Sequence, residues 1–264
     1  MMRGMGRVGD GNTPQEWFYS LPPITRSLLV AVLATTAACS FGIVSPFQLH
    51  LDWTRVWRGF EIWRLASNFV FFGTFSFPFL INLYLLVQYA SRYEVSPFNT
   101  GAGGSSADFA WMLTIGCSLL AIASYFFGLP FMGQPMSFMI MYVWTRKNPD
   151  EMTSIFFFKF QAFYLPWAML AFNLLIGNDI YLPLMGIAAG HVYYFLHYTA
   201  PAELGRDIIK TPTFMIELLG GTPTTPGSFR PRTAPTAPRA AAGGAAARPY
   251  AGHNWGSGNV LGAD

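Results

Sequence analysis

Charged side chains are scarce in this sequence. Asp, Glu, Lys and Arg make up 11% of its 264 residues, whereas 52% of the residues are hydrophobic and 17% are aromatic. Ordinary soluble domains contain roughly a quarter charged residues. The composition therefore argues against a soluble domain and predicts a membrane protein, for which we expect neither a cofactor nor a nucleic-acid partner.

Cysteine is equally scarce, and a cleavable signal sequence is not visible. The two cysteines, Cys39 and Cys117, lie inside apolar segments, which suits small buried side chains and gives no disulfide framework. The residues before Phe18 are glycine-rich and polar, without a short apolar core followed by a small-residue cleavage site. We therefore expect no removable signal peptide.

Six long apolar runs dominate the rest of the chain, near or somewhat off the roughly 20 residues that cross about 30 Å of hydrocarbon. They cover residues 24–45, 65–90, 109–128, 131–146, 155–177 and 180–199, and the fourth is short. Pro78, Pro166 and Pro183 fall inside the second, fifth and sixth runs, where a missing amide hydrogen and a steric clash predict kinks. The sequence thus predicts an all-α membrane protein with six transmembrane helices.

Positive charge is concentrated in alternate gaps between these runs. With six spans both chain ends share one side, and that side holds most of the cations: Arg3, Arg7, Arg26, Arg92, Arg146, Lys147, Lys159, Arg206, Lys210 and the arginines of the tail. The other side holds only Arg55, Arg58 and Arg64. Because positive charge is retained in the cytosol, we expect both termini to be cytosolic.

Those three arginines lie in one loop, residues 45–64, between the first two runs. Trp53, Val56, Trp57 and Phe60 recur in this loop at helical spacing. The spacing predicts an amphipathic helix that lies in the lumenal membrane interface between helices 1 and 2.

The loop ends in Glu61-Ile-Trp63-Arg64, directly before the second apolar run. An Arg at a bilayer boundary is costly unless something fixes it, and an adjacent Trp is a natural interfacial anchor. Two interpretations stay open for this motif. Arg64 either extends its side chain to the interface beside Trp63, or uses its five donors to order several loop carbonyls at once, which Lys could not do.

The sixth run contains Gly186 and Gly190 in a GxxxG pattern, which lets another backbone approach closely and predicts tight helix packing. Taken alone this motif is a weak functional signal. His191 follows it directly, and a hydrogen-bonded polar residue is the favoured interpretation over a catalytic or metal-binding one.

Other polar residues fall inside the apolar runs or at their edges. They are Asn68, Asn82, Gln88, Gln161 and Asn173. Most are expected to supply interhelical hydrogen bonds of about 0.6 kcal/mol each on average. The alternative is that several of them, with His191, line a hydrophilic groove on one face of the bundle.

Beyond Pro201 the composition changes abruptly. Thr, Pro, Ala, Gly and Arg dominate residues 220–249, with too little apolar surface to offset the entropy of ordering, so we predict a disordered cytosolic tail. Near its end an apolar and glycine cluster predicts a docking motif: Trp255, Gly256, Gly258 and Leu261. The predicted domains are a cytosolic segment (1–20), a six-helix transmembrane domain (21–200) and this tail (201–264).

Several short motifs together resemble the rhomboid superfamily: Glu-x-Trp-Arg before the second span, Tyr142-Val-Trp144 at the end of the fourth, and GxxxG in the sixth. Within that superfamily the chain resembles the Derlin family over about residues 14–219. The stretches that carry this resemblance are Asn68-Phe-Val-Phe-Phe-Gly73, Tyr142-Val-Trp144, Tyr164-Leu-Pro-Trp167 and Gly190-His-Val-Tyr-Tyr-Phe195. The tail cluster resembles the short motif by which Derlins bind the valosin-containing AAA ATPase.

The resemblance also locates positions for a catalytic dyad. Proteolytic rhomboids use a Ser in a GxSG motif on the fourth span and a His on the sixth, because a serine hydroxyl is a poor nucleophile without a base within reach. The corresponding positions here are Gly133 and Pro183, and Ser137 lacks flanking glycines. The resemblance thus implies a rhomboid-like pseudoprotease with neither catalytic nor metal-binding residues.

Derlins are endoplasmic reticulum membrane proteins that help to return misfolded proteins to the cytosol for ubiquitin-dependent destruction. The resemblance implies that this function depends on Trp63, Arg64, Gly186 and Gly190, and that the tail cluster recruits the ATPase. The partners it implies are the AAA ATPase, a membrane ubiquitin ligase complex, misfolded clients and the lipid bilayer, with homo- or hetero-oligomerisation left open.

A physical mechanism follows if a short span, kinked helices and embedded polar residues produce an under-length bundle with a wet side groove. Hydrophobic mismatch costs fractions of a kcal/mol per Å, so such a bundle would thin the adjacent bilayer. A polar chain would then cross at lower cost, while the ATPase supplies direction.

Two alternative functions remain. An active intramembrane serine protease is opposed by the missing dyad. A small-molecule transporter is suggested by six spans, but it is opposed by the absence of an inverted pair of broken helices and of a midplane carboxylate. The acidic residues between the first and sixth runs are all expected in loops: Asp52, Glu61, Glu94, Asp108, Asp150, Glu151 and Asp179.

Overall fold

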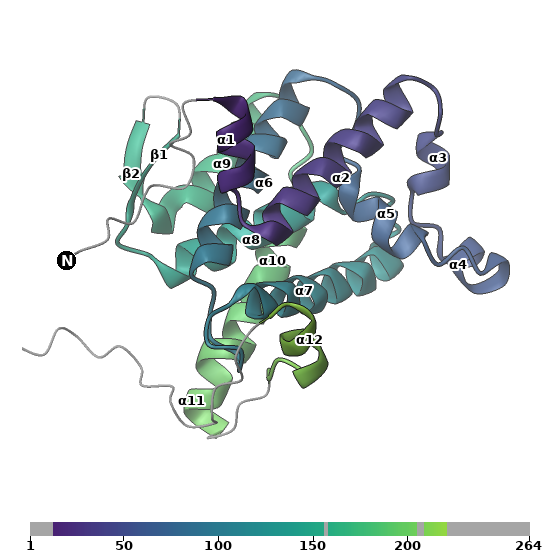
Figure 1. Ribbon diagram of the computed structural model, residues 1–264. Helices are drawn as coiled ribbons and strands as arrows, with labels where there is room; N and C mark the ends of the chain where they lie inside the picture. The colour runs from purple at the N-terminus through teal and green to yellow at the C-terminus, as the bar shows by residue number, and fades with distance from the viewer. Residues whose placement is uncertain (1–12, 156–157, 205–208, 221–264) are drawn as a thin grey trace, which may run out of the picture. The chain divides into compact units, whose positions relative to one another are not determined.

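The computed structural model describes residues 13–155, 158–204 and 209–220 (Figure 1). The chain divides into two units, residues 1–228 and 229–264, and all the described residues belong to the first unit. Helices dominate the described residues, as the sequence predicts. The all-α prediction misses one short antiparallel hairpin.

The N-terminal half contains two long helices and four short ones. They are α1 (Pro14–Ser20), α2 (Pro23–Ser40), α3 (Pro46–Leu49), α4 (Trp53–Gly59), α5 (Arg64–Val70) and α6 (Phe77–Val95). The hydroxyl groups of Thr13, Ser45 and Ser76 cap the N-termini of α1, α3 and α6. Thr13 Oγ1 accepts a hydrogen bond from the Glu16 amide at 3.2 Å, and Ser76 Oγ accepts one from the Phe79 amide at 3.3 Å. Such caps satisfy first-turn amides that have no partner within the helix.

The C-terminal half contains the hairpin and the remaining helices. Its elements are α7 (Ser106–Phe127), α8 (Gly133–Lys147), β1 (Met152–Ile155), β2 (Phe158–Gln161), the 3-10 turn η1 (Ala162–Tyr164), α9 (Leu165–Leu175), α10 (Tyr181–Tyr194), the π-helical turn η2 (Phe195–Thr199), α11 (Ala200–Leu204) and α12 (Thr213–Leu218). The strands pair with Met152 opposite Gln161. In Figure 1 the hairpin and α1 lie on the left, whereas α3, α4 and α5 lie on the right.

Helix α8 is the centre of the fold. Every residue from Pro135 to Thr145 is buried, and α5, α6, α7, α9 and α10 all pack against this helix (Figure 1). A helix that is apolar on all sides is stable only when other elements surround it. The sequence 135–145 is almost entirely apolar or aromatic, which accounts for its central position.

Three predicted spans differ from the observed helices. The second run is not one helix, because residues 71–76 separate α5 from α6. The fifth run begins with most of the hairpin, so that α9 starts only at Leu165. The sixth continues from α10 through η2 into α11, beyond residue 199. Apolar character alone neither distinguishes a helix from a strand nor locates a break, which is why these boundaries were wrong.

The three prolines do not kink the helices. Pro78 and Pro166 occupy the second positions of α6 and α9, and Pro183 occupies the third position of α10. First-turn amides have no intrahelical acceptor, so a proline there removes no helix hydrogen bond. The prediction of kinks is therefore wrong, because these residues start helices instead of interrupting them.

The apolar helices differ widely in length. α2 and α7, with 18 and 22 residues, are long and apolar enough by themselves to cross a membrane. α9 has only 11 residues and spans about 16 Å at ~1.5 Å per residue. The sequence placed the shortest helix in the fourth run, but α8 has 15 residues and α9 is shorter.

Glu94 and Asp108 lie in helices α6 and α7, and both carboxylates are buried, so their expected placement in loops is wrong. Glu94 accepts hydrogen bonds from the amides of Ile24 and Thr25 at 2.9 and 2.7 Å. These amides belong to the first turn of α2, where a negative charge is favourable because the helix dipole is positive there. Glu94 therefore fixes the start of α2 against the end of α6.

Asp108 performs a similar role at the start of α7. Its oxygens accept from the amides of Thr100 and Gly104 at 3.1 and 2.8 Å, and from the Thr211 hydroxyl at 2.7 Å. The Thr211 amide also donates to the Thr100 carbonyl at 2.8 Å. Asp108 thus ties the segment before α12 to the connection between α6 and α7.

Candidate functional site

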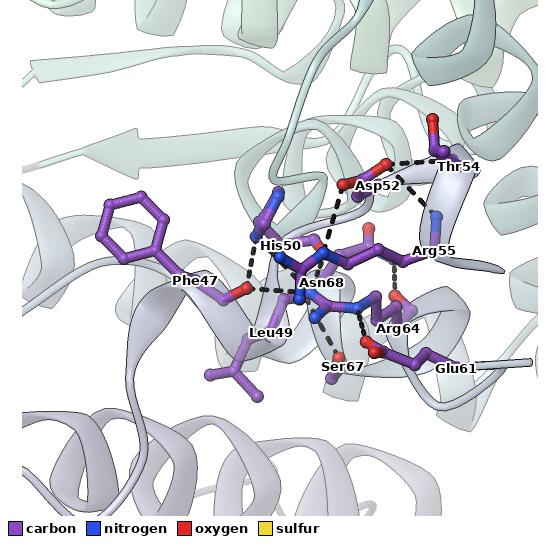
Figure 2. Close-up of polar contacts among 10 residues, drawn as sticks. All are labelled: Phe47, Leu49, His50, Asp52, Thr54, Arg55, Glu61, Arg64, Ser67 and Asn68. Carbon is purple, nitrogen blue, oxygen red and sulfur yellow. Dashed lines mark hydrogen bonds and ion pairs between the residues drawn. The ribbon is translucent and has the colours of Figure 1, made fainter. Parts of the chain in front are cut away.

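Arg64 is buried at the start of α5, with 2% of its surface exposed. Its Nη1 donates to the carbonyl oxygens of Phe47 and His50, each at 2.9 Å, and its Nε donates to Glu61 Oε2 at 2.5 Å (Figure 2). A buried charge is costly unless it is paired and hydrogen-bonded, and here both conditions hold. One guanidinium therefore connects α3 and the residue that follows it, His50, with Glu61 and the first turn of α5.

Neighbouring side chains extend this network. Ser67 Oγ donates to the Leu49 carbonyl at 3.1 Å, and Asn68 Nδ2 donates to the Arg64 carbonyl at 2.6 Å (Figure 2). Asn68 Nδ2 also donates to the Leu65 carbonyl at 3.1 Å. The Met132 amide donates to the Asn68 carbonyl at 3.2 Å. The loop before α5 is thereby attached to the start of α8.

Trp63 behaves differently from its neighbour, because 57% of its surface is exposed. Trp57 and Phe60 are exposed to a greater extent, whereas Val56 is the buried residue of α4. The predicted amphipathic helix over the loop is observed as two short helices, α3 and α4, and only α4 carries the predicted spacing. Exposed aromatic side chains of this kind suit a membrane–water interface.

Asp52 caps α4 through hydrogen bonds from the amides of Thr54 and Arg55 at 2.9 and 3.4 Å (Figure 2). Slight burial raises the pKa of this carboxyl, but the two amides and the charges of His50 and Arg55 lower it more, so the pKa lies below its ordinary value. A carboxyl whose pKa is lowered by folding stabilises the folded form at neutral pH. That contribution is lost as the pH falls through its pKa.

Gly186 and Gly190 lie where α10 crosses α8. A Cβ atom on Gly186 would come within 2.2 Å of the Pro135 carbonyl oxygen, and one on Gly190 would lie 3.0 Å from Tyr142 Cδ1. Real Cβ atoms do not approach a backbone oxygen to 2.2 Å, so the first position requires glycine. The GxxxG pattern therefore marks a close backbone approach.

His191 bonds to Tyr142 at the same crossing. Arg146 Nε donates to the Tyr142 hydroxyl at 2.9 Å, so that hydroxyl is free to donate to His191 Nδ1 at 2.7 Å. The guanidinium of Arg146 also lies 5.0 Å from the centre of the Tyr142 ring. This arrangement is that of a hydrogen-bonded polar residue, the interpretation favoured from the sequence.

A polar notch lies between α6, α8 and α9. Asn173 Oδ1 accepts from Gln134 Nε2 at 3.1 Å and from Asn178 Nδ2 at 3.4 Å. Asn82, Asn173 and Asn178 line a cavity of about 10 Å³ together with Pro78. This is about the volume that one water molecule needs, so the feature is a notch and not a channel.

The structure brings together two of the five residues proposed for a polar groove, Asn82 and Asn173. Asn68 lies under the Arg64 loop, Gln161 is exposed at the end of β2, and His191 lies at the α8–α10 crossing. Sequence reasoning missed Gln134 and Asn178. A polar residue directly beside the start or end of an apolar run was the available signal for both.

The position expected for a nucleophile, Gly133, is tightly packed, since a Cβ atom there would lie 2.8 Å from the Phe71 carbonyl oxygen. Ser137 is buried, and its hydroxyl has no hydrogen-bond partner among the described residues. Pro183, at the position expected for the base, is buried in the first turn of α10.

Comparison with known proteins decides the family. A model of the Der1-like family matches residues 21–213. The chain belongs to this family. Among its relatives, Derlin-2.2 of Zea mays is 37% identical over 213 residues, which cover 76% of this chain and 84% of the relative. Derlin-1 of Arabidopsis thaliana is 38% identical over 211 residues, covering 79% and 78%. The Derlin resemblance is thereby confirmed.

The Der1-like match includes both the Glu61-Ile-Trp63-Arg64 loop motif and the Gly186–Gly190 crossing. The predicted ATPase-binding residues fall beyond the matched range and outside the described residues: Trp255, Gly256, Gly258 and Leu261. Their role stays a prediction.

Arg64→Lys should loosen the loop of this Der1-like protein, because the three donors of an ammonium radiate from one nitrogen and cannot reproduce the separate positions of Arg64 Nε and Nη1. Buried acceptors left unsatisfied cost about 1–3 kcal/mol, so we expect protease cleavage within residues 45–63 to rise by about ten-fold in limited proteolysis. Arg58→Lys, at an exposed position of α4, is the control. Equal cleavage of Arg64→Lys and the parent protein would contradict the role given to Arg64.

Gly186→Ala should destabilise the bundle more than Gly190→Ala. The first substitution places a methyl group 2.2 Å from a backbone oxygen, whereas the second places one 3.0 Å from the Tyr142 ring and 3.1 Å from the Met139 carbonyl oxygen, where shifts of a few tenths of an ångström suffice. Overpacking of this kind costs about 1–3 kcal/mol, which thermal or detergent-induced unfolding of the purified protein can measure. The reverse order of stabilities would show that the α8–α10 approach is not the limiting contact.

Proposed function

We propose that this protein helps to move misfolded proteins from the lumen or membrane of the endoplasmic reticulum to the cytosol for degradation, without cleaving them. Membership of the Der1-like family supports the assignment to endoplasmic-reticulum-associated degradation. The observation that carries the mechanism is the polar notch beside the short helix α9.

The proposed arrangement in the membrane uses α2, α6, α7, α8, α9 and α10 as six spans with both termini in the cytosol. Successive spans then alternate in direction, which puts the Arg64 loop on the lumenal side and the hairpin on the cytosolic side. The separation of α4 from the hairpin and α1 in Figure 1 is consistent with this alternation.

The absence of proteolysis rests on local geometry. Gly133 has no space for a side chain at the position of the nucleophile, and Ser137 Oγ is buried. His191 is engaged by the Tyr142 hydroxyl. A serine needs a base within hydrogen-bond reach to act as a nucleophile, so these groups favour a pseudoprotease.

The notch and the length of α9 together favour thinning of the bilayer. Even together with η1, α9 forms an apolar helix over Ala162–Leu175 of about 21 Å at ~1.5 Å per residue, which is shorter than about 30 Å of hydrocarbon and would thin the adjacent lipid. Asn173 lies near the lumenal end of α9 in the proposed orientation, where Gln134 and Asn178 converge on it. The thinned region therefore coincides with side chains that can bind water or the backbone of a client.

Direction of movement is assigned to the tail. Trp255, Gly256, Gly258 and Leu261 would recruit the AAA ATPase, and a membrane ubiquitin ligase would mark the client. Asp108 and Thr211 support this division, since they attach the segment that leads into the tail to the start of α7.

Replacing the centre of the notch tests the mechanism. Asn173→Leu removes the acceptor shared by Gln134 and Asn178, and we expect slower degradation of a misfolded lumenal reporter. A barrier raised by about 1 kcal/mol would slow it about five-fold in a pulse-chase measurement.

The matched control is Gln161→Leu, which changes a polar residue that lies outside the notch. Equal abundance and membrane insertion of both variants must accompany the comparison. If the reporter were degraded as fast with the Asn173→Leu variant as with the Gln161→Leu variant, the notch would have no part in client movement.

Deletion of residues 255–261 tests the tail separately. The shortened protein should insert normally and lose most of its co-purification with the AAA ATPase, because an extended peptide binds through a few anchoring side chains. The control deletes seven residues within 232–245, leaving the cluster intact. Unchanged binding after loss of the cluster would refute the proposed recruitment.

A further inference from the structure

A second hollow lies on the side of the bundle formed by α1, α2 and α6. This α1–α2–α6 groove has a volume of about 270 Å³ and is lined by Trp17, Leu29, Leu80, Val87 and Ser91, among others. Buried side chains of α2 and α6 form its floor, and the exposed Leu80 and the adjacent Tyr84 leave it open along α6. The groove is neither part of the polar notch nor of the Arg64 loop.

The groove and the notch occupy opposite faces of α6. Groove residues recur at positions 80, 83, 84, 87, 88 and 91, which form one stripe of a helix with about 3.6 residues per turn. Notch residues of the same helix are Pro78, Ile81 and Asn82, which project from the other side. A ligand in the groove would therefore not compete with a client at the notch.

The length of the groove matches one lipid leaflet. Leu80 and Ser91 are eleven residues apart, which is about 16 Å along an α-helix. This is roughly half of the ~30 Å hydrocarbon core, the distance that one acyl chain covers. A volume below the ~300–1,000 Å³ of drug-sized sites also suits a single narrow chain.

The lining changes from apolar to polar along this length. Leu80 and Leu83 line one end, whereas Gln88, Ser91 and the indole of Trp17 line the other. Ser91 is buried and its hydroxyl donates to the Gln88 carbonyl at 3.2 Å. Trp is typical of membrane–water interfaces, so the polar end lies at the height of the headgroups.

Arg26 does not itself line the groove, but its guanidinium is held against the backbone of Leu21, which does. Arg26 Nη2 donates to the carbonyls of Leu21 and Tyr19 at 2.9 and 3.3 Å, and Leu21 itself lines the groove. The guanidinium lies 5.8 Å from the centre of the Phe18 ring. The Nε atom of Arg26 is buried without a hydrogen-bond partner among the described residues. With five donors in all, Arg26 retains the capacity to bind an anionic group.

The buried acid at the end of α6 is already occupied. Glu94, one turn beyond Ala90 on α6, accepts hydrogen bonds from the amides of Ile24 and Thr25 and from the Thr25 hydroxyl. Its charge is directed at the first turn of α2 and is balanced there by the helix dipole. The polar end of the groove is thus suited to a phosphate, with an apolar channel leading away from it.

We propose that the α1–α2–α6 groove holds one acyl chain of a glycerophospholipid whose phosphate is bound by Arg26. The inference rests on the proposed membrane arrangement, in which α1 and Arg26 face the cytosolic leaflet. The bound lipid fills the space between α2 and α6 under Trp17. It supports the face of α6 opposite the notch.

A photoreactive lipid tests this assignment. Full-length protein is reconstituted into phosphatidylcholine nanodiscs that contain a small fraction of phosphatidylcholine with a diazirine in its acyl chain. After illumination, labelled peptides are identified by mass spectrometry. Labelling should concentrate on α1, α2 and α6 of the groove, above that of the exposed face of α7.

Two variants and one control sharpen the result. Leu80→Trp fills the apolar end and Arg26→Gln removes the charge, and each should lower groove labelling by about ten-fold. Ile122→Trp, at an exposed position of α7, should leave it unchanged. A parallel arm with a photoreactive free fatty acid should label the groove weakly, since it lacks the phosphate.

Uniform labelling of α7 and the groove, or groove labelling unaffected by Leu80→Trp, would overturn the proposal. Stronger labelling by the fatty acid than by the phospholipid would overturn the choice of ligand. Failure of the underlying membrane arrangement is separately visible, because an N-terminal tag on the parent protein would then be protected from added protease in sealed microsomes. Because the notch does not contain Arg26, the rate of reporter degradation with the Arg26→Gln variant tests the notch independently of lipid binding in the groove.

Discussion

The close approach of α10 to α8 is the contact on which the rest of the structure depends. At Gly186 the backbone of α10 lies against the Pro135 carbonyl, with no space for even one methyl group. Because α8 is buried from residue 135 to residue 145, the remaining helices must pack around this pair. The notch arises where α6 and α9 meet beside the first turn of α8, and the orientation of Tyr142 toward His191 follows from the same crossing.

Buried charges in this weakly charged chain hold connections instead of filling the core. Arg64 orders the loop before α5, Glu94 fixes the start of α2, and Asp108 fixes the connection before α7. About half of their hydrogen bonds go to backbone groups, which lie at the ends of α3 and α2 and in the loop before α7. This is where amides and carbonyls lack partners, and where the cost of burying a charge is repaid by several strong hydrogen bonds. These three buried charged residues therefore determine how the loops leave the bundle, whereas apolar packing determines the bundle itself.

The sequence was informative where one residue type has one physical meaning. Gly186 and Gly190, four residues apart in an apolar run, predicted tight helix packing, and the structure identifies α8 as the partner; the motifs around Arg64 and Tyr142 led to the correct family. It was uninformative where tertiary context decides. The fifth apolar run begins with strand residues of β1 and β2 instead of helix, and Pro78 starts α6 instead of kinking it. The notch combines residues from three separate elements, and their convergence depends on packing that periodicity does not encode.

Water accessibility at the end of α9 tests the central claim most directly. A spin label at position 176, which lines the notch, is compared in bilayer nanodiscs with one at position 170 in the middle of α9, after Cys39 and Cys117 have been replaced by serine. Collision with a water-soluble nickel chelate and with oxygen gives the polarity at each label. The account predicts a water-exposed label at position 176, only eleven residues beyond Leu165. A hydrocarbon-like environment at position 176 would contradict it.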